Sequence, residues 1–209
     1  MNSVSYQAKR GQLQTYFDRT AVEAWSRLTS DDVKVSRIRA TVRAGRNRMR
    51  QTLIDWLPQD LSGRRVLDAG CGTGASAVEL ARRGAQVVAV DLSPSLIRLA
   101  GERMPAGLAG SIDFQVGDML DPALGRFDAI LAMDSLIHYR PEDIVRVLAC
   151  LGERVEHTML FTFAPRTPLL TLMHAIGRLF PRSDRAPMIE PVRHQSLNRI
   201  IASNPALKG

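Results

Sequence analysis

Residues 64–74 read Arg-Arg-Val-Leu-Asp-Ala-Gly-Cys-Gly-Thr-Gly, and this stretch decides the fold. An apolar run ends in the acid Asp68, after which come three closely spaced glycines, Gly70, Gly72 and Gly74. Residues 75–83 then have the composition of a helix. Strand, glycine-rich turn and helix in this order predict the first unit of a doubly wound α/β sheet. Its ligand would lie against the glycine backbone and the N-terminus of the helix.

The acid before the glycines distinguishes between two classes of cofactor. Gly70, Gly72 and Ala75 also satisfy a dinucleotide fingerprint, which is a weak signal when it stands alone. A carboxylate at the end of the first strand would repel a pyrophosphate, whereas it would attract a methionine ammonium or a sulfonium. The run 66–74 resembles motif I of the class I methyltransferases, and S-adenosylmethionine is therefore the expected cofactor.

Strands and helices alternate after residue 64, which predicts a mainly parallel sheet with right-handed crossovers. The expected strands are 65–69, 86–90, 112–116, 127–132 and 158–163. The antiparallel strand pair that usually completes the class I fold cannot be recognised beyond them. Helices are expected instead at 168–180 and 192–202, and the expectation is that the chain is truncated or disordered at its end.

The first 57 residues are predicted to form a helical substrate or lid segment. Residues 1–15 are polar and are expected to be frayed or loosely helical, and 16–28 to form a short amphipathic helix. A long helix is expected over 34–57, with an apolar stripe beside a row of arginines, Arg39, Arg43, Arg46 and Arg50. Such a row is commonly a solvated face. Because this one adjoins the apolar stripe, we expect it to bind carboxylates or phosphates.

Composition is consistent with this division into an N-terminal segment, an α/β core at 58–163 and a helical C-terminal segment at 164–209. Of 209 residues 45% are apolar, enough for a sizeable core, and the two cysteines suggest neither a disulfide nor a metal site. The net charge of +7 resides in residues 1–65, which hold 13 Lys or Arg and 6 Asp or Glu. No signal peptide or spanning run is evident. We expect a cytoplasmic protein that could touch a membrane peripherally. The apolar helix 168–180 could serve as a lid or as a membrane-contacting element, and the favoured alternative is an ordinary buried helix.

Several stretches together resemble the magnesium protoporphyrin IX O-methyltransferases of chlorophyll and bacteriochlorophyll synthesis in photosynthesis. The stretches that carry the resemblance are 16–20, 24–28, 36–46, 134–139 and 161–165. The resemblance implies methyl transfer from S-adenosylmethionine to one propionate of Mg-protoporphyrin IX, giving the 13-monomethyl ester. It implies no protein-bound metal, since the magnesium arrives inside the substrate. The family is associated with magnesium chelatase, and direct handover of porphyrin from its large subunit is a further expectation.

The resemblance and the strand ends together assign roles to individual residues. The expected cofactor-binding residues are Asp68, Gly70, Cys71, Gly72, Gly74, Asp91, Leu92, Asp118, Met119 and Met133. Asp91 stands 23 positions beyond Asp68, near the spacing at which an acid meets a ribose diol. The expected substrate-binding residues are Phe17, Trp25, Asp134 and the four arginines of the row.

The catalytic candidates are His138 and Tyr16. His138 follows the fourth strand, where it could hydrogen-bond the reacting carboxylate or offer an axial nitrogen to the substrate's magnesium. Its alternative role is that of a loop histidine that caps the next helix. Tyr16 could instead anchor the N-terminal helix on the core.

Three other functions are alternatives to methylation of a porphyrin. A quinone or phenol O-methyltransferase would need a base, and His138 could serve. An RNA methyltransferase would use the basic N-terminus on phosphates, but that segment holds aromatics suited to packing and has no recognised RNA module, so no nucleic-acid partner is expected. A non-catalytic S-adenosylmethionine-binding protein would fit a chain without the C-terminal strands.

Overall fold

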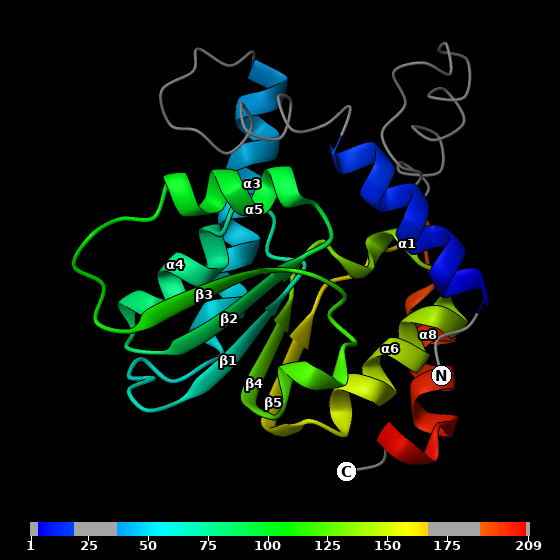
Figure 1. Ribbon diagram of the computed structural model, residues 1–209. Coiled ribbons are helices and arrows are strands. Elements are labelled where there is room, and N and C mark those ends of the chain that lie inside the picture. Colours follow the sequence, from blue (N-terminus) through cyan, green and yellow to red (C-terminus); the bar gives the residue numbers. More distant parts are fainter. Residues whose placement is uncertain (1–3, 19–36, 167–188, 208–209) are drawn as a thin grey trace.

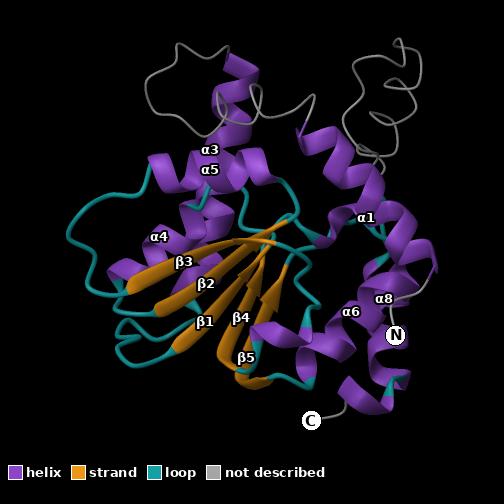
Figure 2. Cartoon of the chain, viewed as in Figure 1, coloured by secondary structure: helices purple, strands orange, loops and turns teal. Residues whose placement is uncertain are grey.

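The computed structural model describes residues 4–18, 37–166 and 189–207. Their centre is a five-stranded sheet in the order β3-β2-β1-β4-β5, with every pair of neighbouring strands parallel (Figure 2). The strands are β1 (Arg65–Ala69), β2 (Gln86–Asp91), β3 (Ser111–Val116), β4 (Phe127–Ala132) and β5 (Val155–Phe161). The doubly wound parallel sheet predicted from the glycine stretch is confirmed.

Helices cover both faces of the sheet (Figure 1). One face packs against α3 (Arg37–Asp55) and α4 (Ala75–Arg82), with α5 (Pro94–Glu102) against β2 and β3. The other face packs against α1 (Val4–Tyr16), α6 (Pro141–Gly152) and α8 (His194–Ser203). Short 3-10 helices, η2 (Pro122–Leu124), η3 (Leu136–His138) and η5 (Pro205–Leu207), complete the described elements.

Successive residues of β1 alternate between the two cores. Val66 packs with the α3 and α4 residues, and Leu67 with the α6 and α8 residues; both side chains are fully buried. A strand that is covered on both faces carries a continuous apolar run rather than an alternating one, as the sequence has here. The register places Leu67 beside Val88 on β2 and Ile130 on β4, so the ends of these strands lie at the same edge.

The fifth strand begins earlier than predicted. It was expected at 158–163 and occupies Val155–Phe161. Val155 pairs with Phe127 across an irregularity between Phe127 and Ala129, and β5 is an edge strand whose second and third residues are polar and exposed. The pairing therefore starts before the apolar pattern does.

The described residues 4–16 form a regular helix, so the prediction of a frayed or loosely helical start is wrong for this part of 1–15. α1 buries Tyr6 and Leu13 against the same core as α6. The Tyr6 ring stacks on Tyr139 with 5.1 Å between centroids, and Ser5 Oγ donates to Asp143 Oδ1 on α6 at 2.8 Å. Burial of the two α1 side chains stabilises the docked helix by about 1.5–3 kcal/mol each.

The remaining predicted helices divide between described and undescribed residues. The long N-terminal helix is α3, whose last turn ends before Pro58, and the helix expected at 192–202 is α8. Most of the helix expected at 16–28 and the helix expected at 168–180 lie outside the described residues. The division of the chain into segments 1–57, 58–163 and 164–209 stays a prediction.

Candidate active site

A cavity of about 590 Å³ opens at the carboxyl edge of the sheet, where parallel α/β sheets bind their ligands. Its floor is the glycine loop after β1, the end of β2 and the segments that follow β3 and β4. Its walls come from α3 and from α1. The cavity thus unites the glycine stretch, the strand-end acids and the arginine row in one place.

Gly70 brings the glycine loop close to the segment after β4. Its φ is +80°, and a Cβ built on it would lie 2.5 Å from the Cβ of Ser135. The peptide N–H groups of Gly70 and Cys71 both donate to the carbonyl of Val90 at the end of β2. A side chain at position 70 would therefore both strain the backbone and push Ser135 away from the loop.

Asp68 offers an unsatisfied buried carboxylate beside this loop. The residue is 2% exposed, and its Oδ2 has no hydrogen-bond partner among the described residues. Burial raises the pKa of Asp68 to about 7, and the negative charge of Asp91 acts in the same direction. A cation bound in the cavity would donate a hydrogen bond to this oxygen and compensate its charge. Asp68 is therefore suited to bind the ammonium of a methionine group.

Asp91 holds the glycine loop in shape, a role that the sequence did not reveal. Its Oδ2 accepts from Gly72 N at 2.9 Å, and its Oδ1 accepts from Ser93 N at 3.0 Å. Burial raises the pKa of the Asp91 carboxyl group. Asp91 and Leu92 both line the cavity, as expected of residues that meet a ribose.

Asp118 lines the cavity but binds α1 with both oxygens. Oδ1 accepts from the Tyr6 hydroxyl at 2.7 Å and from Leu120 N at 2.9 Å, while Oδ2 meets Arg10 at 2.8 Å. The neighbouring Met119 is buried at the cavity wall. Asp118 was expected to bind the cofactor, and this role stays a prediction; its observed contacts also make it an anchor of α1.

Tyr6, not Tyr16, reaches the cavity from α1. Tyr16 ends the helix with its ring at right angles to Phe17, 5.3 Å between centroids, and it is absent from the cavity wall. Burial raises the pKa of Tyr16. Sequence reasoning missed Tyr6, although Tyr6 and Leu13 are seven residues apart and so share one helix face.

His138 lies at the cavity on η3, immediately beyond β4. It is 9% exposed, and its ring meets Phe17 edge-on at 6.2 Å between centroids. Met133 and Asp134, from the same segment, also line the cavity. The structure therefore places His138, Phe17 and Asp134, three of the predicted residues, at the cavity.

Three arginines of the predicted row, Arg43, Arg46 and Arg50, line the cavity wall on α3. Arg46 Nε lies 2.9 Å from Asp134 Oδ2, and burial lowers the pKa of Arg46 without removing its charge at neutral pH. The side chain of Arg39 and the whole of Trp25 lie outside the described residues. Two further arginines at the cavity, Arg82 and Arg103, were not predicted.

The fold and the site together define a class I S-adenosylmethionine-dependent methyltransferase. Residues 66–156 match the family profile described as a methyltransferase domain. The chain belongs to the magnesium-protoporphyrin IX methyltransferase family, because it is 55% identical over 194 residues to the magnesium-protoporphyrin O-methyltransferase of Rhodobacter capsulatus. That match covers 93% of this chain and 87% of the relative.

Other comparisons agree with this membership. Residues 132–208 match the profile described as the magnesium-protoporphyrin IX methyltransferase C-terminus. The chloroplastic magnesium protoporphyrin IX methyltransferase of Arabidopsis thaliana is 32% identical over 82% of this chain and 56% of its own. The crystal structure of magnesium protoporphyrin IX methyltransferase from Synechocystis PCC 6803 with bound SAH superimposes with a TM-score of 0.79 at 26% identity. The match covers 93% of this chain and 87% of that one.

No helix within the described residues has both the length and the apolar character that crossing a bilayer requires.

Proposed function

We propose that this chain transfers the methyl group of S-adenosylmethionine to the 13-propionate of Mg-protoporphyrin IX, giving the monomethyl ester on the route to bacteriochlorophyll or chlorophyll. The observation that carries the proposal is the cavity itself, which has at its floor the buried carboxylate of Asp68, whose Oδ2 has no partner among the described residues, and on its wall three arginines. A cationic cofactor and an anionic substrate can thus bind in one cavity, each against charges of opposite sign.

The floor of the cavity binds and orients the cofactor. Asp68 accepts from the methionine ammonium, the glycine loop lies along the methionine group, and Asp91 and Leu92 meet the ribose. Met119 packs at the adenine and Met133 at the methionine end. When bound, the cofactor supplies an electrophilic methyl group on a positively charged sulfur.

The wall of the cavity binds the porphyrin. Phe17 and His138 offer ring surface to a flat apolar macrocycle, and Arg43, Arg46 and Arg50 offer guanidinium groups to its carboxylates. A propionic acid has an ordinary pKa of about 4 and is ionised at neutral pH, so methyl transfer requires no strong base. The residues around the carboxylate must instead strip its water and align its oxygen with the methyl group.

Charge disappears as the reaction proceeds, since the carboxylate and the sulfonium neutralise each other. A tight guanidinium on the reacting oxygen would stabilise the bound substrate more than the transition state and would slow the reaction. We therefore assign the arginines to the propionate that is not methylated. His138, a weaker hydrogen-bond donor, is assigned to the reacting carboxylate.

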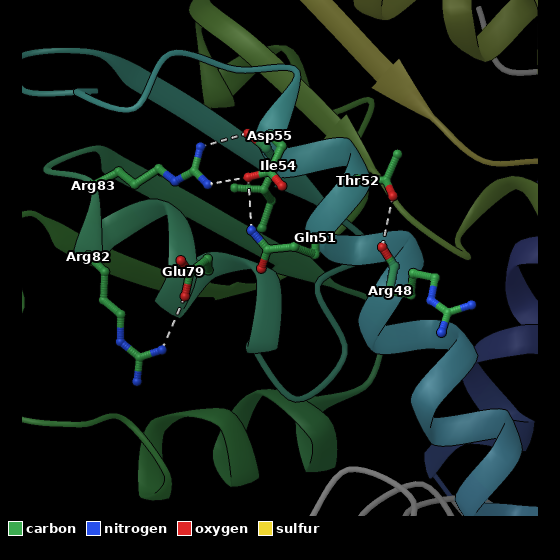
Figure 3. Close-up of polar contacts among 8 residues, drawn as sticks. All are labelled: Arg48, Gln51, Thr52, Ile54, Asp55, Glu79, Arg82 and Arg83. Atoms are coloured by element: carbon green, nitrogen blue, oxygen red, sulfur yellow. Dashed lines mark hydrogen bonds and ion pairs between the residues drawn. The ribbon is translucent and has the colours of Figure 1, made fainter.

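A pair of substitutions on one helix tests the arginine assignment. Arg43→Ala removes a guanidinium from the cavity wall, while Arg48→Ala removes one from the exposed surface of the same helix (Figure 3). We expect Arg43→Ala to weaken the binding of Mg-protoporphyrin IX by roughly tenfold, which corresponds to one hydrogen bond to a charged group. The shift of the porphyrin's Soret band measures this binding. Affinity for S-adenosylhomocysteine should not change.

The Arg48→Ala variant is expected to match the wild type in both affinities. Equal losses in the two variants would mean that net charge attracts the porphyrin without a specific site. A loss confined to cofactor affinity in Arg43→Ala would contradict the assignment of the row to the substrate.

Two expectations stay predictions. One is direct handover of the porphyrin from the large subunit of magnesium chelatase, which the resemblance implies; the other is peripheral contact of the protein with a membrane, which rests on the apolar composition of residues 168–180.

A further inference from the structure

Asp134 has an unusual backbone conformation at the point where β4 enters the cavity. Its φ is +59°, the only positive φ at a non-glycine among the described residues. An L-residue in this left-handed region costs about 1–2 kcal/mol, and aspartate tolerates it better than most residues. The conformation persists only where neighbouring groups hold it.

Thr162 holds this conformation from the neighbouring strand. The peptide N–H of Asp134 donates to Thr162 Oγ1 at 2.7 Å. Thr162 directly follows β5, and its own N–H donates to the carbonyl of Ala132, which continues the ladder between β4 and β5. The backbone of Thr162 is therefore fixed by the sheet beside Ala132, which lies two residues before Asp134.

The carboxylate of Asp134 then orients Arg46. Oδ2 lies 2.9 Å from Nε, and both side chains are largely buried, 17% and 24% exposed. Because Nε lies on one edge of the planar guanidinium, this contact sets the direction in which the rest of the group faces the cavity. Thr162, Asp134 and Arg46 form a chain of contacts from the sheet to the cavity wall.

The helix that carries Arg46 is fixed separately at its other end. Arg83, which follows α4, donates to the carbonyl of Ile54 and to Asp55 Oδ1, both at 2.8 Å (Figure 3). Asp55 lies nine residues beyond Arg46, about 13 Å along the helix. Losing the contact with Asp134 would therefore remove one constraint on the Arg46 side chain while α3 keeps its anchored end.

We propose that Thr162 is a positioning residue for porphyrin binding, because it holds Asp134 in the conformation that orients Arg46 into the cavity. The inference rests on the proposed function, since it assigns Arg46 to a porphyrin carboxylate. Thr162 itself does not line the cavity. Its hydroxyl acts through the peptide N–H of Asp134 alone.

The experiment compares Thr162→Val, which keeps the shape and removes the acceptor, with Thr162→Ser, which restores it. Thr52→Val is the matched control, because the Thr52 hydroxyl donates only within α3, to the carbonyl of Arg48 (Figure 3). Each variant is measured for KM and kcat with Mg-protoporphyrin IX, and for Kd with S-adenosylhomocysteine. We expect Thr162→Val to raise KM by about fivefold or more, the effect of one lost hydrogen bond, with the Kd within about twofold of the wild type.

Thr162→Ser and Thr52→Val should both have the wild-type KM. An unchanged KM in Thr162→Val would overturn the inference, and so would an equal loss of cofactor affinity, which would signal collapse of the whole site. A serine variant that fails to restore KM would overturn it as well.

If the valine variant does not fold, Asp134→Asn and Asp134→Gly replace it. Both residues tolerate the positive φ, and of the two only the asparagine side chain can still accept a hydrogen bond from Arg46. The glycine variant must then have the higher KM, and equal values would overturn the inference.

The same measurements separate this inference from the proposed function. If the wild type methylates the porphyrin and the KM of Thr162→Val is unchanged, the inference is overturned and the proposed function stands. A wild type that neither binds nor methylates the porphyrin would overturn the proposed function and, with it, the inference.

Discussion

Replacing Asp68 by asparagine should stabilise the protein at alkaline pH in the absence of cofactor and, at the same time, weaken cofactor binding. The carboxyl group is 2% exposed, and one of its oxygens has no partner among the described residues. Asparagine keeps the shape of the side chain and cannot ionise. The substitution therefore removes the cost of a buried charge together with the group that attracts the cofactor's ammonium.

The sign and size of the effect follow from the pKa. Burial raises the pKa of Asp68 from 3.8 to about 7. Because the folded-state pKa lies above the unfolded one, the carboxyl group's contribution to stability is complete below pH 3.8 and is lost as the pH rises to about 7. The loss is about 1.4 kcal/mol per pH unit, hence about 3 kcal/mol between about pH 5 and pH 7. The asparagine variant does not suffer this loss.

Urea unfolding of the cofactor-free wild type and Asp68→Asn, at about pH 5 and about pH 8, measures the effect. The free energy of unfolding of the variant, relative to the wild type, should rise by about 3 kcal/mol between the two conditions, and pH-independent effects of the substitution cancel in this comparison. Asp113→Asn, at an exposed position on β3, should show no such rise. Calorimetry should show cofactor binding weakened by about ten- to hundredfold in Asp68→Asn. Parallel pH dependence of the wild type and Asp68→Asn would refute the reasoning.

Three further substitutions test the site. His138→Ala should lower kcat by about tenfold or more and leave S-adenosylhomocysteine affinity within about twofold, measured by steady-state kinetics and calorimetry; an unchanged kcat would remove His138 from the mechanism. Asp91→Ala should weaken cofactor binding by about 1–3 kcal/mol in the same calorimetric assay, with porphyrin affinity unchanged; intact cofactor affinity would refute its role at the ribose. Gly70→Ala should destabilise the fold by about 2–4 kcal/mol in urea unfolding, through its positive φ and its contact with Ser135, and Ser135→Gly added to it should recover only the part due to the contact. Full recovery would show that the φ costs nothing.

Four strands of the sheet could be placed from the sequence to within a residue, because β1, β2 and β4 are mainly apolar runs and β3 alternates polar and apolar residues between Gly110 and Gly117. β5 could not, because it is the edge strand: its second and third residues, Glu156 and His157, are exposed, and the apolar pattern starts only after them. Backbone pairing with β4 decides where an edge strand begins, and a sequence pattern does not contain that information.

The regular, packed form of α1 was not predicted because its buried face consists of two residues in an otherwise polar helix. Tyr6 and Leu13 pack on Tyr139 and on the core beneath it, more than a hundred positions along the chain. Tertiary contacts of this kind override a weak local pattern. The Asp118 carboxylate is similarly engaged by Tyr6 and Arg10, and no local feature of α1 predicts that.

That the strand-end acids lie at one cavity could be predicted, since the carboxyl ends of parallel strands meet at one edge of the sheet. Contacts between distant elements could not. The pairing of Arg46 with Asp134 depends on how α3 lies over the edge of the sheet, and that of Asp134 with Thr162 on the pairing of β4 with β5. The sequence shows these residues singly, whereas only the fold brings them together.

The central claim is that one cavity binds both a cationic cofactor and a porphyrin dicarboxylate for methyl transfer. The most direct test is to titrate Mg-protoporphyrin IX into the purified protein, follow its Soret band, add S-adenosylmethionine and identify the product by mass spectrometry. The account predicts saturable binding and formation of the monomethyl ester with release of S-adenosylhomocysteine. Binding without ester formation would contradict the catalytic assignment. Absence of binding would contradict the porphyrin assignment and leave a methyltransferase fold with another substrate.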